Sequence, residues 1–397
     1  MQTAGSTQMS ARAQAHGMDG AFVERDWPPL ALAEVCTLLS EFPALSAAEE
    51  ILSTSPRPFS AAGLVRTTQA RVFVKRHHCS VRNREGLLEE HRFLAHLRAH
   101  GAPVPRVFAS ASGETAIEIG EWVYEVHEAA EGIDLYEDAF SWTPFLCAQH
   151  AHAAGRALAQ LHLASASFAA PHRGVRPLVA GFTIFAHEDP AAEMERYLTA
   201  RPALAVRSAV RACAEKSLDL LAPFHAELTL HLPALAPLWT HNDLHASNLL
   251  WSTRDDQAHA TSIIDFGLAD RTNAVHDIAH AIERNIVEWL ALVGHPERPN
   301  DVPVHLDHLA ALLAGYESLR PLSQAEAAAL APMTALCHAE FALSEADYFL
   351  SILHSEEKAP MAYDGWLVGH AQWFHSKAGR SLLNALRKFA DAHMEVR

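Results

Sequence analysis

Two neighbouring motifs constrain the fold of this chain more than any other feature. The stretch "HNDLHASNLLW" covers residues 241–251, and "TSIIDFGLAD" covers residues 261–270. The apolar runs at 249–251 and 262–264 predict two short strands, each with an acidic or amide side chain at one end. A pair of such strands would bring three polar side chains together, those of Asp243, Asn248 and Asp265.

This set of side chains suits the transfer of a phosphoryl group. Such a transfer needs an acceptor hydroxyl that is aimed and a polyphosphate whose charge is neutralised by metal. Asp243 can accept or orient the hydroxyl proton, whereas Asn248 and Asp265 offer hard oxygen ligands for Mg²⁺. The order His-x-Asp-Leu-x-x-x-Asn followed by Asp-Phe-Gly is typical of the catalytic and metal loops of protein kinases, and it groups His241 with the catalytic residues. The alternative is a structural hairpin in which Asp243 and Asn248 only cap turns.

The residues expected to hold the nucleotide phosphates lie upstream. The runs 59–66 and 71–75 alternate like two strands of a hairpin, and Lys75 ends the second run. Glu90 lies in the helix that follows and would pair with Lys75 over the phosphates. Glu89 is the neighbouring alternative, but Glu90 shares the apolar face of its helix.

The pattern along the chain predicts an α+β, bilobal fold. Residues 1–45 comprise a tail, loose over its first twenty residues, and a short helix in "PPLALAEVCTLLSEFP". Residues 46–126 carry strand patterns and one helix, which predicts a small β-rich N-terminal lobe. Residues 127–397 are mostly helical outside the motif region and form the expected larger C-terminal lobe. No long flexible connector interrupts the chain, so we expect one catalytic unit.

Composition narrows the partners. The formal charge of −16 disfavours nucleic acid, whose binding depends on clustered Lys and Arg. No segment is apolar for long enough to predict a membrane span. The five cysteines are scattered without the short spacings of zinc or redox sites, which favours a reducing cytoplasm. The oligomeric state stays open.

Taken together, the motifs resemble those of the aminoglycoside phosphotransferase and choline kinase-like family, the small-molecule branch of the protein-kinase fold. The resemblance covers residues 50–350 and rests on "VFVK", "EEHRFLAHLRAHGAPVP", "AGRALAQLH", "HNDLHASNLL", "IIDFGLAD" and "HDIAH". It implies a bilobal kinase fold, ATP and Mg²⁺ as cofactors, and a small-molecule hydroxyl as acceptor. It also implies that His245 lies in the catalytic loop and that Asp277 supports this loop from a helix.

The hypothesis places MgATP between the lobes, with adenine against the connection near Val126 to Glu128. Two departures from the family pattern stand out. Residue 242 is Asn where the family usually has glycine. The expected phosphate-covering loop is poor in glycine and offers hydroxyl groups instead, at Ser53, Thr54 and Ser55, with Gly63 as its one glycine.

The motifs weigh against other functions. Only 12 residues separate Asp265 from Asp277 (277 − 265), which leaves no room for the peptide-docking segment of a protein kinase. A nucleotide-binding pseudokinase acting as an interaction protein remains the alternative, although all four key residues are present: Lys75, Asp243, Asn248 and Asp265. A metal-dependent hydrolase would need convergent ligands that no second motif supplies.

The acceptor is specified least. An amine-bearing alcohol or an aminoglycoside-like compound is favoured. Trp366 and Trp373 lie seven residues apart and could form an aromatic wall for a cation, although such a pair more often belongs to the core. The other candidates for contact with the acceptor are His245, Asp270, Glu288, Glu340, Glu345 and Tyr348.

Overall fold

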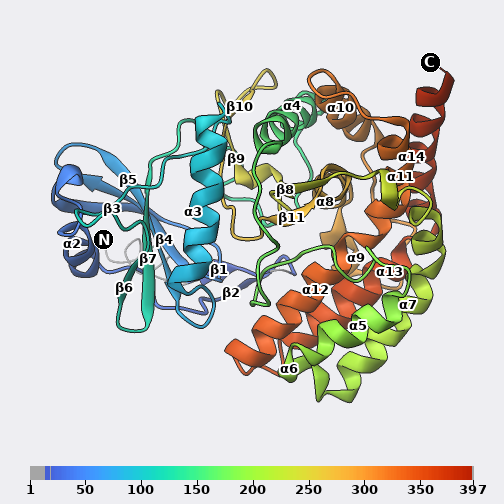
Figure 1. Ribbon diagram of the computed structural model, residues 1–397, viewed down its shortest axis with the longest axis horizontal. Coiled ribbons are helices and arrows are strands. Elements are labelled where there is room, and N and C mark those ends of the chain that lie inside the picture. Colours follow the sequence, from blue (N-terminus) through green and yellow to red (C-terminus); the bar gives the residue numbers. More distant parts are fainter. Residues whose placement is uncertain (1–13, 18, 396–397) are drawn as a thin grey trace, which may run out of the picture.

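The computed structural model describes residues 14–17 and 19–395. Figure 1 shows a sheet-containing N-terminal lobe on the left and a larger helical lobe on the right. Most of the expected tail, residues 1–13 and 18, lies outside the described residues. Of its described part, β1 (Gln14–His16) pairs with β2 (Phe22–Glu24), and the short helix predicted next is α2 (Leu32–Leu39).

The N-terminal lobe is built on a five-stranded antiparallel sheet with the order β3-β4-β5-β7-β6. The strands β4 (Ala61–Thr67) and β5 (Arg71–His78) correspond to the predicted runs 59–66 and 71–75, and β6 (Ile117–Ile119) and β7 (Trp122–Glu128) account for later strand patterns of the predicted lobe. The sequence does not predict β3 (Ala48–Thr54), whose last two residues fall in the expected phosphate-covering loop. Figure 1 shows α3 (Arg84–Ala99) between this sheet and the helical lobe.

The missed strand revises the predicted loop. Ser53 and Thr54 pair with β4, and Thr54 lies opposite Gly63. A Cβ at Gly63 would lie 2.7 Å from the Ser53 carbonyl oxygen on the neighbouring strand, so glycine is needed there for sheet packing. The true connection between β3 and β4 is therefore the short segment 55–60.

Alternation along β5 sorts the side chains between the two faces of the sheet. Val72 and Val74 are fully buried against Val35 and Leu38 of α2. Lys75 lies on the opposite face, toward α3 and the helical lobe. Residue alternation thus directs one apolar stripe into a small core and leaves the other face for chemistry.

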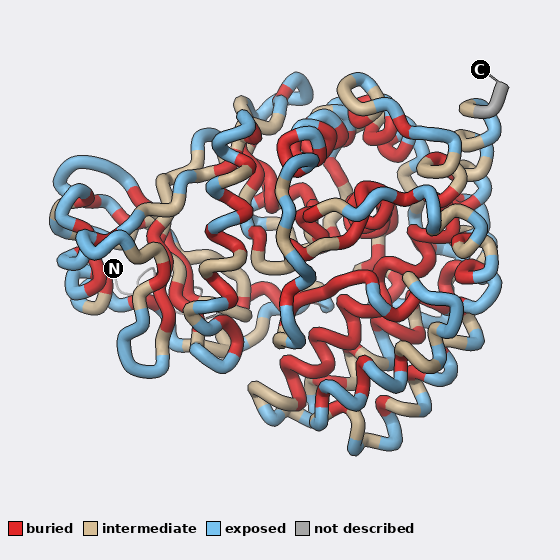
Figure 2. The backbone as a smooth tube through the Cα atoms, viewed as in Figure 1, coloured by how far each residue is buried: buried red, intermediate tan, exposed pale blue. Residues whose placement is uncertain are grey.

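The helical lobe surrounds two short ladders that carry the motifs. The strand β8 (Pro237–Thr240) pairs with β11 (Asp270–Asn273), and β9 (Leu249–Trp251) pairs with β10 (Ala260–Ile263). Behind them runs α8 (Ala274–Ile286), every residue of which is buried. Figure 2 shows this burial concentrated in the interior of the helical lobe. The remaining helices are α4 (Ala148–Ser165), α5 (Pro190–Thr199), α6 (Pro202–Ala205), α7 (Ser208–Leu228), α9 (Trp289–Gly294), α10 (Leu306–Glu317), α11 (Gln324–Leu336), α12 (His338–Asp347), α13 (His370–Trp373) and α14 (Lys377–Glu395).

Two further observations complete the fold. Segments Tyr348–Ile352 and Met361–Gly369 are π-helical, and the first continues directly from α12. Within the described chain, no helix combines the length and apolar character that crossing a bilayer requires.

Candidate active site

The catalytic loop connects β8 to β9 and brings the predicted polar residues together. The Asn248 side-chain amide donates from Nδ2 to the Asp243 carbonyl oxygen at 2.8 Å and to Asp243 Oδ2 at 3.3 Å. Because Nδ2 makes these bonds, Oδ1 is the atom left to contact a cation. Both residues line a cavity of about 110 Å³ between the lobes, together with Lys75 and Asp265. The five-residue spacing read from the sequence therefore places the two side chains side by side.

The carboxylate of Asp277 holds this loop from α8. It accepts hydrogen bonds from the backbone N–H of His241 at 2.9 Å and of Asn242 at 2.7 Å. The ring of His162 in α4 donates a third bond from Nε2 at 2.9 Å. Asp277 is fully buried and does not line the cavity, so it acts as a positioning residue.

Asn242 explains how the chain does without glycine in the catalytic loop. Its φ is +60°, in the left-handed region that glycine and asparagine adopt most easily. Its Oδ1 accepts hydrogen bonds from the hydroxyl groups of Thr240 at 2.8 Å and Thr272 at 3.2 Å, and its Nδ2 donates to the Leu268 carbonyl at 3.2 Å. The amide therefore ties the loop to β8, β11 and the Asp-Phe-Gly segment at once.

His241 also positions the loop and does not line the cavity. One ring nitrogen, Nε2, is 2.9 Å from the Ile264 carbonyl oxygen, and the other, Nδ1, accepts from the Asp243 backbone N–H at 3.2 Å. The ring lies 4.6 Å from that of Phe266. Its inclusion among the catalytic residues is revised, because one ring nitrogen is engaged by the Ile264 carbonyl and the other by the backbone of the loop.

Lys75 and Asp265 form an ion pair across the lobes, with 2.9 Å between Nζ and Oδ1. Although burial opposes it, the charge of Lys75 holds the pKa of Asp265 well below its usual range, so this carboxylate is ionised. The predicted pair between Lys75 and Glu90 is not formed. The nearest cationic group to the Glu90 carboxylate is the Arg173 guanidinium, at 4.0 Å, and Glu89 pairs with Arg176 at 2.6 Å.

The expected adenine contact at Val126 and Glu128 is also revised. The Val126 carbonyl already accepts from Phe108 N at 2.8 Å, and Glu128 N donates to the Arg106 carbonyl at 2.8 Å. The Val126 side chain is buried in the small core on the far face of the sheet. The backbone of residues 129–130 directly follows β7 and is the part of the connection outside these hydrogen bonds.

Sequence reasoning missed three arginines that line the cavity, Arg57, Arg82 and Arg284. Arg57 lies in segment 55–60 and donates from Nη2 to Ser247 Oγ at 2.7 Å. Arg82 donates to the Gly267 carbonyl at 2.6 Å and so fixes the Asp-Phe-Gly segment. Arg57 had a usable signal, since it is the one basic residue of "STSPRPFSAAG".

Arg284 reaches Asp243 from α8. Its Nε lies 3.2 Å from Asp243 Oδ1, and its guanidinium lies 4.2 Å from the ring centre of Phe341. Burial raises the pKa of Asp243 above its ordinary value, while Arg284 and His241 oppose that shift. A carboxyl with a raised pKa is better matched to accepting a proton near neutral pH than an ordinary aspartate is.

The acceptor candidates are divided by the structure. His245 lines the cavity, with Nε2 3.9 Å from Asp243 Oδ2. Glu345 is fully buried and is not among the residues that line the cavity. Neither of its carboxylate oxygens has a hydrogen-bond partner among the described residues. Burial raises its pKa to about 8, and the nearby charges of Arg284 and Asp243 act on it.

Other acceptor candidates are engaged elsewhere. Asp270 Oδ1 accepts from Arg173 N at 2.8 Å, Glu340 accepts from Ile184 N at 2.7 Å, and Glu288 pairs with His305 at 2.8 Å. Tyr348 bonds Asp26 through its hydroxyl. None of these four acceptor candidates lines the cavity, and the contact of Tyr348 joins the helical lobe to the segment that precedes the sheet.

The predicted aromatic wall is corrected too. Trp366 and Trp373 are buried and do not line the cavity, so they belong to the core. The aromatic side chains that do line it are Phe59, Trp142 and Phe341, and the rings of Trp142 and Phe341 lie 6.0 Å apart. Trp366 packs against Trp142 from behind, at 4.3 Å.

Comparison with known families agrees with this geometry. A model of the family described as "APH: Phosphotransferase enzyme family" matches residues 60–322, about two thirds of the chain. The homoserine kinase of Methylobacterium radiotolerans is 26% identical over 283 residues, which cover 70% of this chain and 75% of that one. The homoserine kinase of Xanthobacter autotrophicus is 29% identical over 269 residues, which cover 67% and 70%.

Solved structures confirm the bilobal α+β fold. The microcompartment-associated aminopropanol kinase has a TM-score of 0.56 and 20% identity, with 86% of this chain and 98% of that chain covered. Amicoumacin kinase in complex with AMP-PNP, Ca²⁺ and Ami has a TM-score of 0.53 and 14% identity, with 85% and 92% covered. At these identities the likeness concerns the fold.

Proposed function

The chain belongs to the phosphotransferase enzyme family and is an ATP-dependent small-molecule kinase, and from this premise we propose that it phosphorylates the hydroxyl of an amine-bearing alcohol. The observation that carries the proposal is Glu345. A fully buried carboxyl group without a hydrogen-bond partner among the described residues is costly, and an ammonium group would give its ionised form a partner. Its charge interacts with that of Asp243, the residue that would face the acceptor hydroxyl.

Each cavity residue takes a separate part in this proposal. Asp243 orients the acceptor hydroxyl and accepts its proton, while Arg284 holds the Asp243 carboxylate in place. Trp142 and Phe341 line the cavity and give an acceptor amine an aromatic surface. Glu345 does not line the cavity, and its charge would act on the amine as it acts on Asp243.

The nucleotide side of the cavity is described in the same way. Lys75 and Arg57 would contact the phosphates of ATP. The ionised carboxylate of Asp265 and the free Oδ1 of Asn248 form an oxygen donor set that suits Mg²⁺. When bound, Mg²⁺ neutralises charge on the β- and γ-phosphates. The backbone of residues 129–130 replaces Val126 and Glu128 as the proposed adenine contact.

Similarity to the two homoserine kinases supports this acceptor class, because homoserine carries a primary hydroxyl and an amine. Homoserine also carries a carboxylate, for which Arg284 is the cation closest to Asp243. Location in the cytoplasm remains a prediction from the cysteine pattern.

The test compares acceptors that differ by one group. ADP release would be measured with homoserine and with 4-hydroxybutyrate, which lacks the amine, and then with other amino alcohols and an aminoglycoside. We expect turnover with at least one amine-bearing alcohol and at least about tenfold lower kcat/KM for its deaminated analogue, since an ion pair to a buried carboxylate is lost. Equal kcat/KM values for both members of such a pair would refute the acceptor class while leaving the kinase assignment intact.

The pseudokinase alternative makes a different prediction in the same assay. The four residues whose loss would favour it, Lys75, Asp243, Asn248 and Asp265, all line one cavity. MgATP binding without ADP release for any acceptor would favour an interaction protein over an enzyme.

A further inference from the structure

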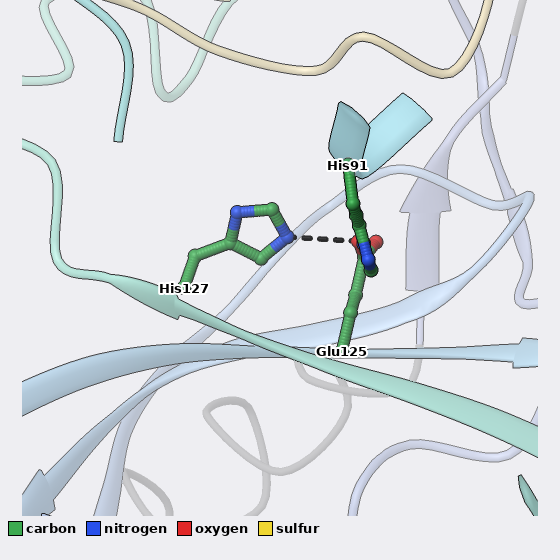
Figure 3. Close-up of side chains that lie close together, drawn as sticks. All are labelled: His91, Glu125 and His127. Atoms are coloured by element: carbon green, nitrogen blue, oxygen red, sulfur yellow. Dashed lines mark hydrogen bonds and ion pairs between the residues drawn. The ribbon is translucent and has the colours of Figure 1, made fainter. Parts of the chain in front are cut away.

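A second cluster of ligand-type side chains lies in the N-terminal lobe, outside the cavity lining. The imidazole rings of His91 and His127 lie against the Glu125 carboxylate, and Figure 3 shows these three side chains together. Oε2 of Glu125 lies 2.8 Å from Nε2 of His91 and 2.8 Å from Nε2 of His127. The three ligand atoms lie within 4.8 Å of one another. Glu125 and His91 are buried, with side chains 1% and 5% exposed.

Two elements build the cluster. Glu125 and His127 are two residues apart on β7 and therefore point to the same face of the sheet. His91 reaches that face from α3, one residue after Glu90. Lys75 is the β5 residue directly opposite Glu125. The cluster thus joins α3 to the sheet next to the lysine that is expected to contact phosphate.

The donor set suits a borderline divalent cation. Two imidazole nitrogens and one carboxylate oxygen are typical ligands of Zn²⁺, with bonds of about 2.0–2.2 Å. Ligand atoms around a tetrahedral ion are then roughly 3.3 Å apart. Oε2 of Glu125 now lies 2.8 Å from each nitrogen, so each of these two distances would lengthen by only about 0.5 Å when an ion binds.

Neighbouring side chains already orient two of the three ligands. His77 Nε2 lies 3.0 Å from Oε1, the other oxygen of Glu125. Thr115 Oγ1 lies 2.8 Å from His91 Nδ1, the nitrogen that faces away from the carboxylate. Such outer contacts fix the carboxylate and the ring orientation in metal sites. The adjacent Lys75 alone could neutralise the Glu125 carboxylate. Two further imidazole ligands, with outer contacts that orient two of the three ligands, go beyond what that neutralisation needs.

We propose that His91, Glu125 and His127 bind a divalent cation of the Zn²⁺ class, and that this ion fastens α3 to β7 beside Lys75. The site is separate from the Asn248 and Asp265 oxygens proposed for the metal of the nucleotide, and its imidazole ligands select a different ion. It supplies a link between α3 and the sheet that the unformed pair of Lys75 and Glu90 does not.

The test is Zn²⁺ titration of the full-length protein after removal of metal by a chelator. Excess Mg²⁺ would be present to occupy the oxygen site, and Co²⁺ would serve as the spectroscopic probe of imidazole coordination. We expect one equivalent of Zn²⁺ to bind, with affinity lowered more than about 100-fold in His91→Gln and in His127→Gln, and about tenfold in the milder Thr115→Val.

Two controls separate this site from others. His308→Gln disrupts the other cluster of potential ligands among the described residues, His305, Asp307 and His308, of which Asp307 is exposed. Asp265→Asn removes a proposed ligand of the nucleotide metal. Both variants should still bind one equivalent of Zn²⁺ with the affinity of the unsubstituted protein. Absence of stoichiometric Zn²⁺ binding by the unsubstituted protein, or binding that survives all three substitutions at the cluster, would overturn the proposal.

Discussion

The catalytic loop and segment 55–60 face the same cavity, but they are held in different ways. The catalytic loop is fixed through its backbone by the buried Asp277 carboxylate. Segment 55–60 begins with two backbone hydrogen bonds of 2.8 Å, made by Ser55 N and by the Pro56 carbonyl. The Arg57 side chain, which reaches the cavity, bonds Ser247 Oγ at 2.7 Å. The catalytic loop is thus supported by a buried carboxylate, whereas Arg57 is held by a single serine hydroxyl.

The cavity volume gives this difference a functional meaning. A cavity of about 110 Å³ is smaller than the roughly 300–1,000 Å³ usual for ligand sites. Arg57 fills part of that space beside Asp243 and Asp265, whose charges act on it. We therefore expect nucleotide binding to displace the Arg57 side chain, whereas the catalytic loop stays in place.

Removal of the Asp277 carboxylate tests how the catalytic loop is supported and should have the largest effect. Asp277→Ala leaves two buried backbone N–H groups without an acceptor, so we expect about 3–5 kcal/mol lower free energy of unfolding and a kcat reduced at least about 100-fold. Denaturant unfolding and steady-state kinetics measure the two effects. A variant with unchanged stability and kcat would show that Asp277 does not support the loop.

Substitution of Arg57 tests the contribution of segment 55–60 to the nucleotide site. Since its guanidinium is proposed to exchange Ser247 for phosphate, Arg57→Ala should raise the KM for ATP about 10- to 100-fold with little change in unfolding free energy. Arg66→Ala is the matched control, because Arg66 pairs with Glu49 and Glu50 on the exposed edge of the same sheet. Equal KM values for ATP in both variants would remove Arg57 from the nucleotide site.

The pH dependence of acceptor binding sharpens the comparison further. The pKa of Glu345 is raised from 4.5 to about 8, and only its ionised form can pair with an ammonium group. For an acceptor that stays protonated, KM should fall up to roughly tenfold per unit as pH rises toward about 8, and Glu345→Gln should abolish this slope.

The same shift has a signature in stability. An acid whose pKa is raised by folding is protonated in the native state, so its contribution to stability is lost as pH rises from 4.5 through about 8. The unfolding free energy of the unsubstituted protein should therefore decrease more over this range than that of Glu345→Gln.

The kinetic experiment has its own contradicting outcome. A KM for the acceptor that does not change with pH in either protein would contradict pairing of Glu345 with an amine.

The two sides of the site also differ in how well the sequence predicted them. The catalytic loop was predictable because its chemistry is carried by fixed spacings, from Asp243 to Asn248 and on to Asp265. The contacts of Lys75 were not, because its partner depends on how α3 sits against the sheet. Helical periodicity shows that Glu90 faces inward, but it does not show which cation it meets.

The acceptor side was the least predictable part. Glu345 and Glu288 are similar acidic residues in the sequence, yet the first is buried near Asp243 and the second pairs with His305. The pair of tryptophans was misleading because Trp366 lies in a π-helical segment, where the usual helical spacing does not hold. Contacts between distant segments, such as Trp142 with Phe341, leave no local pattern.

The central claim is that Asp243 serves the acceptor and Asp265 serves the nucleotide. The most direct test measures MgATP affinity and acceptor-dependent ADP release in Asp243→Asn and Asp265→Asn. We expect Asp243→Asn to lose about 1,000-fold in kcat with MgATP affinity changed less than about threefold, and Asp265→Asn to weaken MgATP binding more than about tenfold. Equal loss of MgATP affinity in both variants, or full turnover by Asp243→Asn, would contradict the account.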